Sequence, residues 1–502
     1  MHNRFRKATF VAITAIINNI LTMLYGLIYN KMVMVHYGSS VTGLVSTLTQ
    51  FASMFTIIEG GFSVAVVVAA YEPILNSDYD ELNSILYTAK KYFNRITVIY
   101  VSLVMLIGIV YVYYLEAPIG YFYALLLLAL TTSTTALSIC GLTKYTVVFA
   151  GHNKQYITTI VGIICKTITW AISLVLIAND YNIVVVYALN TLNIILNVLS
   201  LKYYEKKCYP YISYHGVFDL SKIHGVKDIL FQKIASAVFT STDLILVSLG
   251  LSLSKASVYY VYNAIYSGVY QYLSALSSAP TDSFGQLIKS NQINGATEIF
   301  QIYKKTVVII STVFFTVATV MIIPFIEIYT RNINDENYII PSLAIIFFSY
   351  FYLKLNNMPY GMIINVAGEF EKQNVQTGVA TLINLVCSLI AMRYIGLNGI
   401  VLGSAVGTLV IIVANIIKAR EIIAFNVKYD IIILIFNYVL SLLVANILKY
   451  FIGEYVDNYI TWAIVATIVL ILVMVIIVLF NYFLDRNYVK KCITYFFNKF
   501  NK

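Results

Sequence analysis

The chain has 502 residues, of which 60% are hydrophobic and only 11% are charged, and its mean hydropathy is +0.81. Soluble domains carry roughly 25% charged residues, so this composition excludes a soluble globular protein. The formal net charge of +10 does not indicate nucleic acid as a partner, because a polytopic membrane protein gains such an excess from its cytoplasmic loops.

Apolar runs of about twenty residues recur along the whole chain, and each can cross a hydrocarbon core of roughly 30 Å as a helix. The first run follows Arg4, Arg6 and Lys7 and is too long for the apolar region of a signal peptide, so we expect it to be retained. The predicted spans, in chain order, are 9–30, 41–71, 96–115, 119–143, 155–178, 183–201, 229–250, 256–281, 306–329, 338–366, 374–394, 399–417, 431–449 and 459–484. We therefore predict an all-α integral membrane protein with about 14 transmembrane helices.

The charged loops predict an orientation. With the N-terminus inside, about 26 Lys and Arg residues fall in cytoplasmic segments and about five fall outside, which orients the chain by the positive-inside rule. The residues expected outside are Lys31, Lys255, Arg331, Arg393 and Lys449. Both termini are therefore expected in the cytoplasm.

The cysteines do not form a recognisable pattern. Cys140, Cys165, Cys208, Cys387 and Cys492 fall in spans or predicted cytoplasmic segments, and no CxxC or Cys/His spacing occurs. Neither disulfides nor structural zinc are expected.

The chain contains an internal repeat at a separation of roughly 214 to 218 residues, and such repeats place the substrate site of many transporters between two halves. The aligned pairs are Lys90-Lys91 with Lys304-Lys305, Ala150-Gly151 with Ala367-Gly368, Lys154-Gln155 with Lys372-Gln373, Asn182 with Asn398, Lys202 with Lys418 and Glu205 with Glu421. Because a shift of six spans preserves the direction of crossing, the repeats are parallel. We predict two pseudo-symmetric six-helix lobes over 1–205 and 229–428, a cytoplasmic linker over 206–228, and two extra C-terminal helices with a basic tail over 429–502.

Several motifs carry a resemblance to a known family. In the first half these are Glu59-Gly60-Gly61-Phe62-Ser63-Val64-Ala65, Tyr71-Glu72-Pro73-Ile74 and Lys90-Lys91-Tyr92-Phe93. In the second half they are Thr242-Asp243-Leu244-Ile245, Tyr259-Tyr260-Val261-Tyr262 and Ser283-Phe284-Gly285-Gln286-Leu287-Ile288. Together with the six-plus-six-plus-two arrangement, they resemble the polysaccharide transporter branch, which includes O-antigen-type repeat-unit flippases, of the multidrug/oligosaccharidyl-lipid/polysaccharide exporter superfamily. The linker departs from a minimal family pattern by carrying His215 and His224, to which we assign no function.

The resemblance implies a function. Family members move undecaprenyl-pyrophosphate-linked oligosaccharides, or related cell-envelope precursors for O-antigen or capsule, to the outer leaflet of the bacterial cytoplasmic membrane. Their two lobes surround a central cavity that opens alternately to each side. The implied partners are the lipid-linked glycan, membrane lipids and other polysaccharide-assembly proteins.

The sequence does not indicate an enzyme or a cofactor. It contains no GxxxxGK[ST] phosphate-binding loop, and the glycines near position 60 lie in an apolar run that predicts a helix rather than a strand-to-helix turn. No Ser/His/Asp arrangement, HExxH motif or carboxylate pair is visible. We therefore expect a secondary transporter without a cofactor, driven by protons, Na⁺ or the membrane potential.

Charges inside predicted spans are the main candidate site residues, because Asp, Lys or Arg at a helix centre costs about 2.5 to 3.5 kcal/mol on insertion scales. The candidates are Glu59, Lys166, Asp243 and Lys354. Lys166 and Lys354 lie near the middle of their spans, where one cation from each lobe would attract a pyrophosphate; the alternative is a Lys–Glu or Lys–Asp pair that locks helices together. Glu59 and Asp243 would couple transport to protons or Na⁺ if burial raises their pKa; the alternative is a structural role.

Tyrosines form a stripe on the eighth predicted span. Tyr259, Tyr262, Tyr266 and Tyr270 are spaced by three, four and four residues, which places them on one helix face. Their rings and hydroxyls would suit sugar binding, and ordinary helix packing is at least as good an explanation.

Other functions remain open at this stage. A multidrug exporter or a peptidoglycan-precursor exporter would share the fold. A membrane glycan polymerase or glycosyltransferase would need a sizeable external loop or acidic motif, and the predicted external connections are short.

Overall fold

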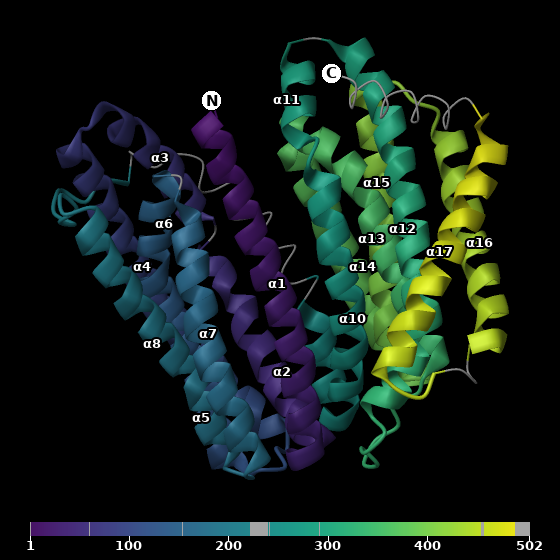
Figure 1. Cartoon of the computed structure of the whole chain (residues 1–502), viewed down its shortest axis with the longest axis horizontal. Helices are drawn as coiled ribbons and strands as arrows, with labels where there is room; N and C mark the ends of the chain where they lie inside the picture. The colour runs from purple at the N-terminus through teal and green to yellow at the C-terminus, as the bar shows by residue number, and fades with distance from the viewer. Residues whose placement is uncertain are drawn as a thin grey trace. The chain divides into compact units, whose positions relative to one another are not determined.

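The computed structural model describes residues 2–59, 61–152, 154–220, 239, 241–290, 292–452 and 456–486. Within these ranges the chain consists of helices and connecting loops, without a β-strand (Figure 1). The predicted all-α fold is therefore confirmed. The chain divides into two compact units, Met1–Ser257 and Val258–Lys502.

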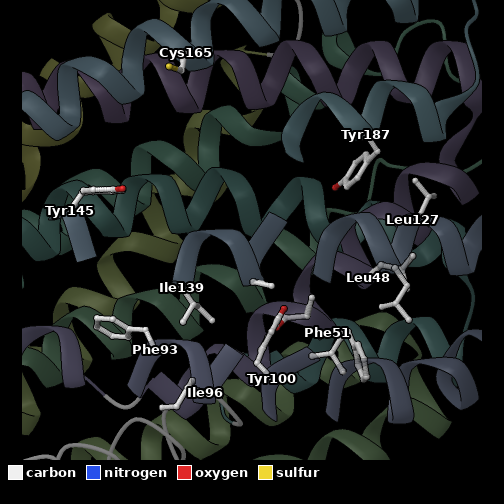
Figure 2. Packing of buried hydrophobic residues seen from close by; sticks show 14 of the residues in the cluster. Leu48, Phe51, Phe93, Ile96, Tyr100, Leu127, Ile139, Tyr145, Cys165 and Tyr187 are labelled. Atoms are coloured by element: carbon white, nitrogen blue, oxygen red, sulfur yellow. The ribbon is translucent and has the colours of Figure 1, made fainter. Parts of the chain in front are cut away.

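The first unit is built from long apolar helices around one core. Its helices are α1 (His2–Tyr37), α2 (Ser39–Met54), α3 (Phe62–Asn76), α4 (Tyr79–Tyr114), α5 (Tyr121–Leu137), α6 (Thr143–Gly151), α7 (Gln155–Ala178) and α8 (Ile183–Cys208). The helical segment Ser241–Gly250 also belongs to this unit. Phe51, Phe93, Tyr100, Leu127 and Ile139 pack in the core, as Figure 2 shows. These side chains come from α2, α4, α5 and the π-helical turn Ser138–Leu142, so the core joins elements that are distant in the sequence.

The second unit repeats this construction and adds two helices. Its helices are α10 (Leu253–Ser278, which begins in the first unit), α11 (Thr281–Lys289), α12 (Ile293–Tyr329), α13 (Pro341–Ala367), α14 (Phe370–Ile395), α15 (Leu397–Ile422), α16 (Val427–Ile452) and α17 (Tyr459–Leu484). α16 and α17 pack against α12 (Figure 1). The repeat is visible in element lengths, because α4 has 36 residues and α12 has 37.

The span count is supported in large part. Eleven helices of the described residues are long and apolar enough to cross a membrane. α10 and α13 have 26 and 27 residues, which is enough length, but they are rich in Tyr and other polar residues. Of the seventh predicted span, the structure describes residue 239 and the helix Ser241–Gly250. The chain is a multi-pass membrane protein, and the count of fourteen stays a prediction.

The prediction of one continuous helix over 41–71 was wrong. α2 ends at Met54, a 3₁₀ turn covers Phe55–Glu59, and α3 begins at Phe62. Gly61 has a φ of 78°, in the left-handed region that only glycine adopts without strain. Interrupted helices of this kind are common in transporters.

The long helices also extend beyond the apolar runs that predicted them. Lys90 and Lys304, expected in loops, lie inside α4 and α12. Cys140, Cys165, Cys208 and Cys387 are free thiols. Cys492 and His224 lie outside the described residues.

Candidate cation sites in the two units

Lys166 is a half-buried cation on α7 of the first unit. Its ammonium donates a hydrogen bond to Asn18 Oδ1 at 3.4 Å and lies 5.8 Å from the ring centroid of Trp170. Trp170 in turn stacks on Tyr25 at 3.8 Å. Lys166 forms no ion pair with a carboxylate of the described residues, so the pairing with Glu59 or Asp243 that sequence analysis allowed does not occur there.

Lys354 on α13 is the candidate cation of the second unit. Its ammonium donates to Tyr350 Oη at 3.1 Å. It lies 4.9 Å from the ring centroid of Tyr270, 5.1 Å from that of Tyr350 and 5.5 Å from that of Phe351. Attraction to aromatic rings of this kind contributes about 0.5–2 kcal/mol, more where water is excluded. The structure therefore joins two of the predicted site residues, Lys354 and Tyr270.

The other tyrosines of the stripe pack within the unit. Tyr259, Tyr262 and Tyr266 are buried, and each ring contacts Phe347 of α13. Tyr262 Oη donates to the carbonyl of Tyr338 at 3.0 Å, and Tyr266 Oη donates to the carbonyl of Ala344 at 2.8 Å. These contacts account for three of the four rings by helix packing.

The two predicted carboxylates have different surroundings. Asp243 is 4% exposed on the helix Ser241–Gly250, as a carboxylate inside a span should be. Glu59 ends the 3₁₀ turn and is half-exposed. Glu59 therefore lies outside the α-helices, because α2 ends at Met54 and α3 begins at Phe62.

Sequence analysis missed a buried ion pair in the second unit. Lys304 on α12 pairs with Asp430 in the first turn of α16, and both side chains are 5% exposed. Tyr360 also bonds the Asp430 carboxylate, and the ring centroid of Phe425 lies 4.5 Å from the Lys304 ammonium. The repeat pointed to Lys304, but its partner lies 126 residues away in the appended helices.

A second missed feature is the connection that follows α8. Residues 209–219, which we call the strap, dock along the first turns of α4. Asn83 Oδ1 accepts hydrogen bonds from the backbone N–H groups of Ser213 at 2.7 Å and Tyr214 at 3.2 Å. Asn83 Nδ2 donates to the carbonyl of Tyr211 at 2.9 Å. Part of the predicted linker is therefore an ordered component of the first unit.

Other strap contacts extend this docking. The backbone N–H of Asp219 donates to Thr88 Oγ1 at 3.1 Å. The guanidinium of Arg95 lies 4.8 Å from the ring centroid of Phe218. Tyr214 Oη donates to the carboxylate of Glu205, and burial first, then this carboxylate, raises the pKa of Tyr214.

His152, after α6, completes the docking surface of the strap. Its Nδ1 lies 2.8 Å from the Val148 carbonyl and its Nε2 lies 2.9 Å from Tyr211 Oη. The geometry assigns the proton to Nδ1, so Nε2 accepts from the tyrosine. Its ring packs on Tyr209 with centroids 4.1 Å apart. Burial lowers the pKa of His152 from its ordinary value of 6.5, and Lys154 lowers it further, against the opposing effect of the Val148 carbonyl.

Comparison with known proteins gives a match by structure alone. No family model matches the chain, and no curated protein matches it by sequence. The solved structure of the lipid II flippase MurJ, in an inward closed conformation, matches with a TM-score of 0.68 and 15% identity over 94% of this chain and 98% of that chain. A multidrug resistance MATE family transporter of the MOP superfamily, in an inward-facing conformation, matches with a TM-score of 0.59 and 14% identity over 79% and 93%. The eukaryotic MATE transporter AtDTX14 matches with a TM-score of 0.54 and 14% identity over 89% and 99%. The chain therefore has the fold of MurJ and the MATE transporters, as the motif resemblance predicted.

Proposed function

We propose that the chain is a flippase that moves a lipid-linked oligosaccharide, with an undecaprenyl-pyrophosphate or related carrier, from the cytoplasmic to the outer leaflet by alternating access. The observation that supports this most is the fold match with a lipid II flippase over nearly the whole length of both chains. A pyrophosphate that enters the membrane would be attracted to cations within the spans. Lys166 and Lys354 are the residues we assign to it.

The surroundings of the two lysines favour a substrate role. A lysine that serves as a helix lock needs a carboxylate, and Lys166 has only an amide and an indole among its described neighbours. Lys354 lies among three rings that would also stack on sugars. An anion at either ammonium would gain a charge-assisted hydrogen bond worth roughly 1.5–3 kcal/mol.

Two observations argue against a membrane-bound polymerase or glycosyltransferase. The connections on the predicted outer side are short; the longest that the structure describes is 330–340, between α12 and α13. The described residues contain no group of three or more His, Cys, Asp or Glu side chains that could hold a metal ion.

A peptidoglycan-precursor flippase is the second candidate, and the MurJ match favours it specifically. Lipid II and the lipid-linked oligosaccharides share an isoprenoid pyrophosphate, so the two lysines would serve either substrate. The sugar portion distinguishes them.

Reconstitution tests the proposal. Proteoliposomes should flip a labelled undecaprenyl-pyrophosphate-linked oligosaccharide faster than lipid II and faster than a cationic drug, without ATP and with a dependence on an ion gradient, the membrane potential or downhill substrate. A faster rate with lipid II would select the second candidate. Strict dependence on ATP, or transport of the drug alone, would refute a flippase for lipid-linked glycans.

Lysine variants test the site. Lys166→Ala and Lys354→Ala should each lower the flipping rate about tenfold or more, since each removes an interaction of 1.5–3 kcal/mol, while thermal stability stays near that of the wild type. Arginine at either position should rescue partly, because it keeps the charge and changes the geometry. Lys428→Ala, at an exposed position of α16, is the matched control. Wild-type flipping by both alanine variants, or rescue of Lys166→Ala by Glu59→Gln, would overturn the assignment.

A further inference from the structure

The internal repeat relates two sets of three side chains, one set in each unit. Each set comes from the long helix α4 or α12, from a later helix of the same unit (α6 or α13), and from the segment that follows the six-helix lobe. The separations between partners are 214, 216 and 216 residues. The corresponding pairs are Lys90 with Lys304, Lys144 with Tyr360, and Tyr214 with Asp430.

In the second unit the cation of this set is paired with an anion. Lys304 and Asp430 form a buried ion pair, and Tyr360 bonds the same carboxylate. The unit therefore supplies both the cation and the anion.

In the first unit the corresponding position holds cations without that anion. Lys90 Nζ lies 5.6 Å and Lys144 Nζ lies 5.9 Å from the ring centroid of Tyr214, which replaces the carboxylate. Both lysines are half-buried, and neither forms an ion pair with a carboxylate of the described residues. An exposed lysine, Lys202 on α8, adds to the positive charge felt by Lys144.

A carboxylate lies close to Lys144. Glu205 attracts Lys144, and its oxygen already accepts the hydrogen bond from Tyr214 Oη. Like charges close together at a partly desolvated position repel one another more strongly than in water. An anion bound between them would relieve this repulsion.

We propose that Lys90 and Lys144 form a binding site for a phosphate-type anion, which supplies the negative charge that Asp430 provides in the second unit. The chemistry fits a pyrophosphate of a lipid-linked substrate or the phosphate head group of an anionic phospholipid, since lysines bind both as point charges. The site itself does not depend on transport. Assigning the pyrophosphate to a substrate rests on the proposed function, because only a flippase would present one here.

Thermal unfolding of the purified full chain tests the site. In neutral detergent at low ionic strength, inorganic pyrophosphate should raise the Tm of the wild type saturably, by a few degrees, because a ligand that binds only the folded state stabilises it. The double variant K90Q/K144Q should show no such rise. The matched control K206Q/K207Q removes the same charge from two exposed lysines at the end of α8 and should respond like the wild type.

Two further variants keep the test decisive if K90Q/K144Q does not fold. K90R/K144R retains the charge and should retain the response. E205Q removes the opposing carboxylate and should bind pyrophosphate several-fold more tightly. The absence of a Tm rise in the wild type, an equal rise in K90Q/K144Q and K206Q/K207Q, or weaker binding by E205Q would overturn the proposal.

Nanodiscs distinguish the two sources of the anion. If a phospholipid head group is the ligand, phosphatidylglycerol should raise the Tm relative to pure phosphatidylcholine and reduce the effect of pyrophosphate, and K90Q/K144Q should abolish both. If the substrate is the ligand, only pyrophosphate should act, and K90Q/K144Q should also slow flipping of the lipid-linked glycan. If the wild type flips the lipid-linked glycan but shows no Tm rise with pyrophosphate, the site is refuted and the proposed function stands. If pyrophosphate raises the Tm but the chain flips no lipid-linked glycan, the proposed function is refuted and the site stands.

Discussion

Buried charged side chains in this chain are stabilised by neighbouring groups that replace their interactions with water. This stabilisation is most complete for Lys304 and Asp430, since the pair is buried and enclosed by the rings of Phe300 and Phe425. The mutual attraction of a buried pair offsets the cost of desolvation only while both partners are present. The pair therefore stabilises the packing of α16 on α12 only while both side chains are present. Its contribution to stability is measured by comparing the single variants with the double variant.

The first prediction concerns this pair. Lys304→Met or Asp430→Leu alone should destabilise the second unit by about 3–5 kcal/mol, because each leaves an unpaired buried charge. The double variant should recover most of this loss, because the apolar side chains replace the pair. The measurement is thermal unfolding in detergent, with Lys428→Ala in the same first turn of α16 as a control that leaves Tm unchanged. A double variant that is as unstable as the sum of the single variants would show that the two groups do not act as a pair.

The second prediction concerns His152 and the strap. Its folded pKa lies below 6.5, so as pH falls through this value the unfolded chain takes up a proton that the folded chain does not. Stability of the first unit should therefore fall as the pH drops through 6.5 and level off below the folded pKa. His152→Gln should flatten the dependence of Tm on pH over this window. His215→Gln, at an exposed histidine of the strap, should keep the wild-type profile; an identical slope in all three proteins would contradict the assignment.

Which single residues matter was only partly predictable. Lys166 and Lys354 stand out because a cation in an apolar run is costly. The rings around Lys354 come from α10 and α13, and no local pattern relates Tyr270 to a residue on another helix. Hydropathy places Lys304 in a loop, because the apolar run begins at residue 306. Helix α12 begins earlier, at Ile293, and includes Lys304.

At the scale of elements, close helix packing depends on small residues. α15 carries Gly399, Gly403 and Gly407 at intervals of four residues, on one helix face. A Cβ at Gly403 would overlap the side chain and backbone of Ser388 on α14. Ser388 Oγ donates to the Ile400 carbonyl at 3.0 Å, so the two helices also bond across this contact. Small-xxx-small faces of this kind let helix backbones approach closely in membranes.

The third prediction follows from this packing. Gly403→Ala should destabilise the second unit by about 1–3 kcal/mol, because the overlap includes backbone atoms that cannot rotate away. Gly378→Ala is the matched control on α14, where a Cβ meets nothing within 4 Å. Its effect should be neutral or a gain of up to about 1 kcal/mol, as for glycine to alanine in any helix. Equal Tm values for the two variants would contradict the close-packing argument.

Element boundaries were less predictable than element existence. The run 41–71 contains a single charged residue, Glu59, so hydropathy predicts one span. The break depends instead on backbone geometry at Gly61. The adjacent glycines Gly60 and Gly61 are the sequence feature that indicates a break in the helix. The apolar residues on both sides favour a continuous span instead.

At the scale of the whole molecule, lysine and arginine placement predicts orientation, and the fold adds no information about which side is inside. The structure does define which exposed residues a reagent can reach. Asn334 lies exposed in the connection 330–340, and Cys208 is exposed at the end of α8. The described helices between them are Ser241–Gly250, α10, α11 and α12, of which α12 alone meets the length and hydropathy criteria for a span.

The fourth prediction uses these two positions to test orientation and span count together. In a chain whose other four cysteines are replaced, a membrane-impermeant maleimide should label Asn334→Cys in intact cells and should label Cys208 only after permeabilisation. Three crossings separate the positions if the seventh and eighth predicted spans both traverse the membrane, so the two positions lie on opposite sides. If either of these spans fails to cross, the number becomes even and both positions share a side, which refutes the fourteen-span arrangement. If Cys208 is labelled in intact cells and Asn334→Cys is not, the crossings are right and the orientation is reversed. A Cys208→Ser version with Asn334 unchanged provides the background, because none of its positions should react.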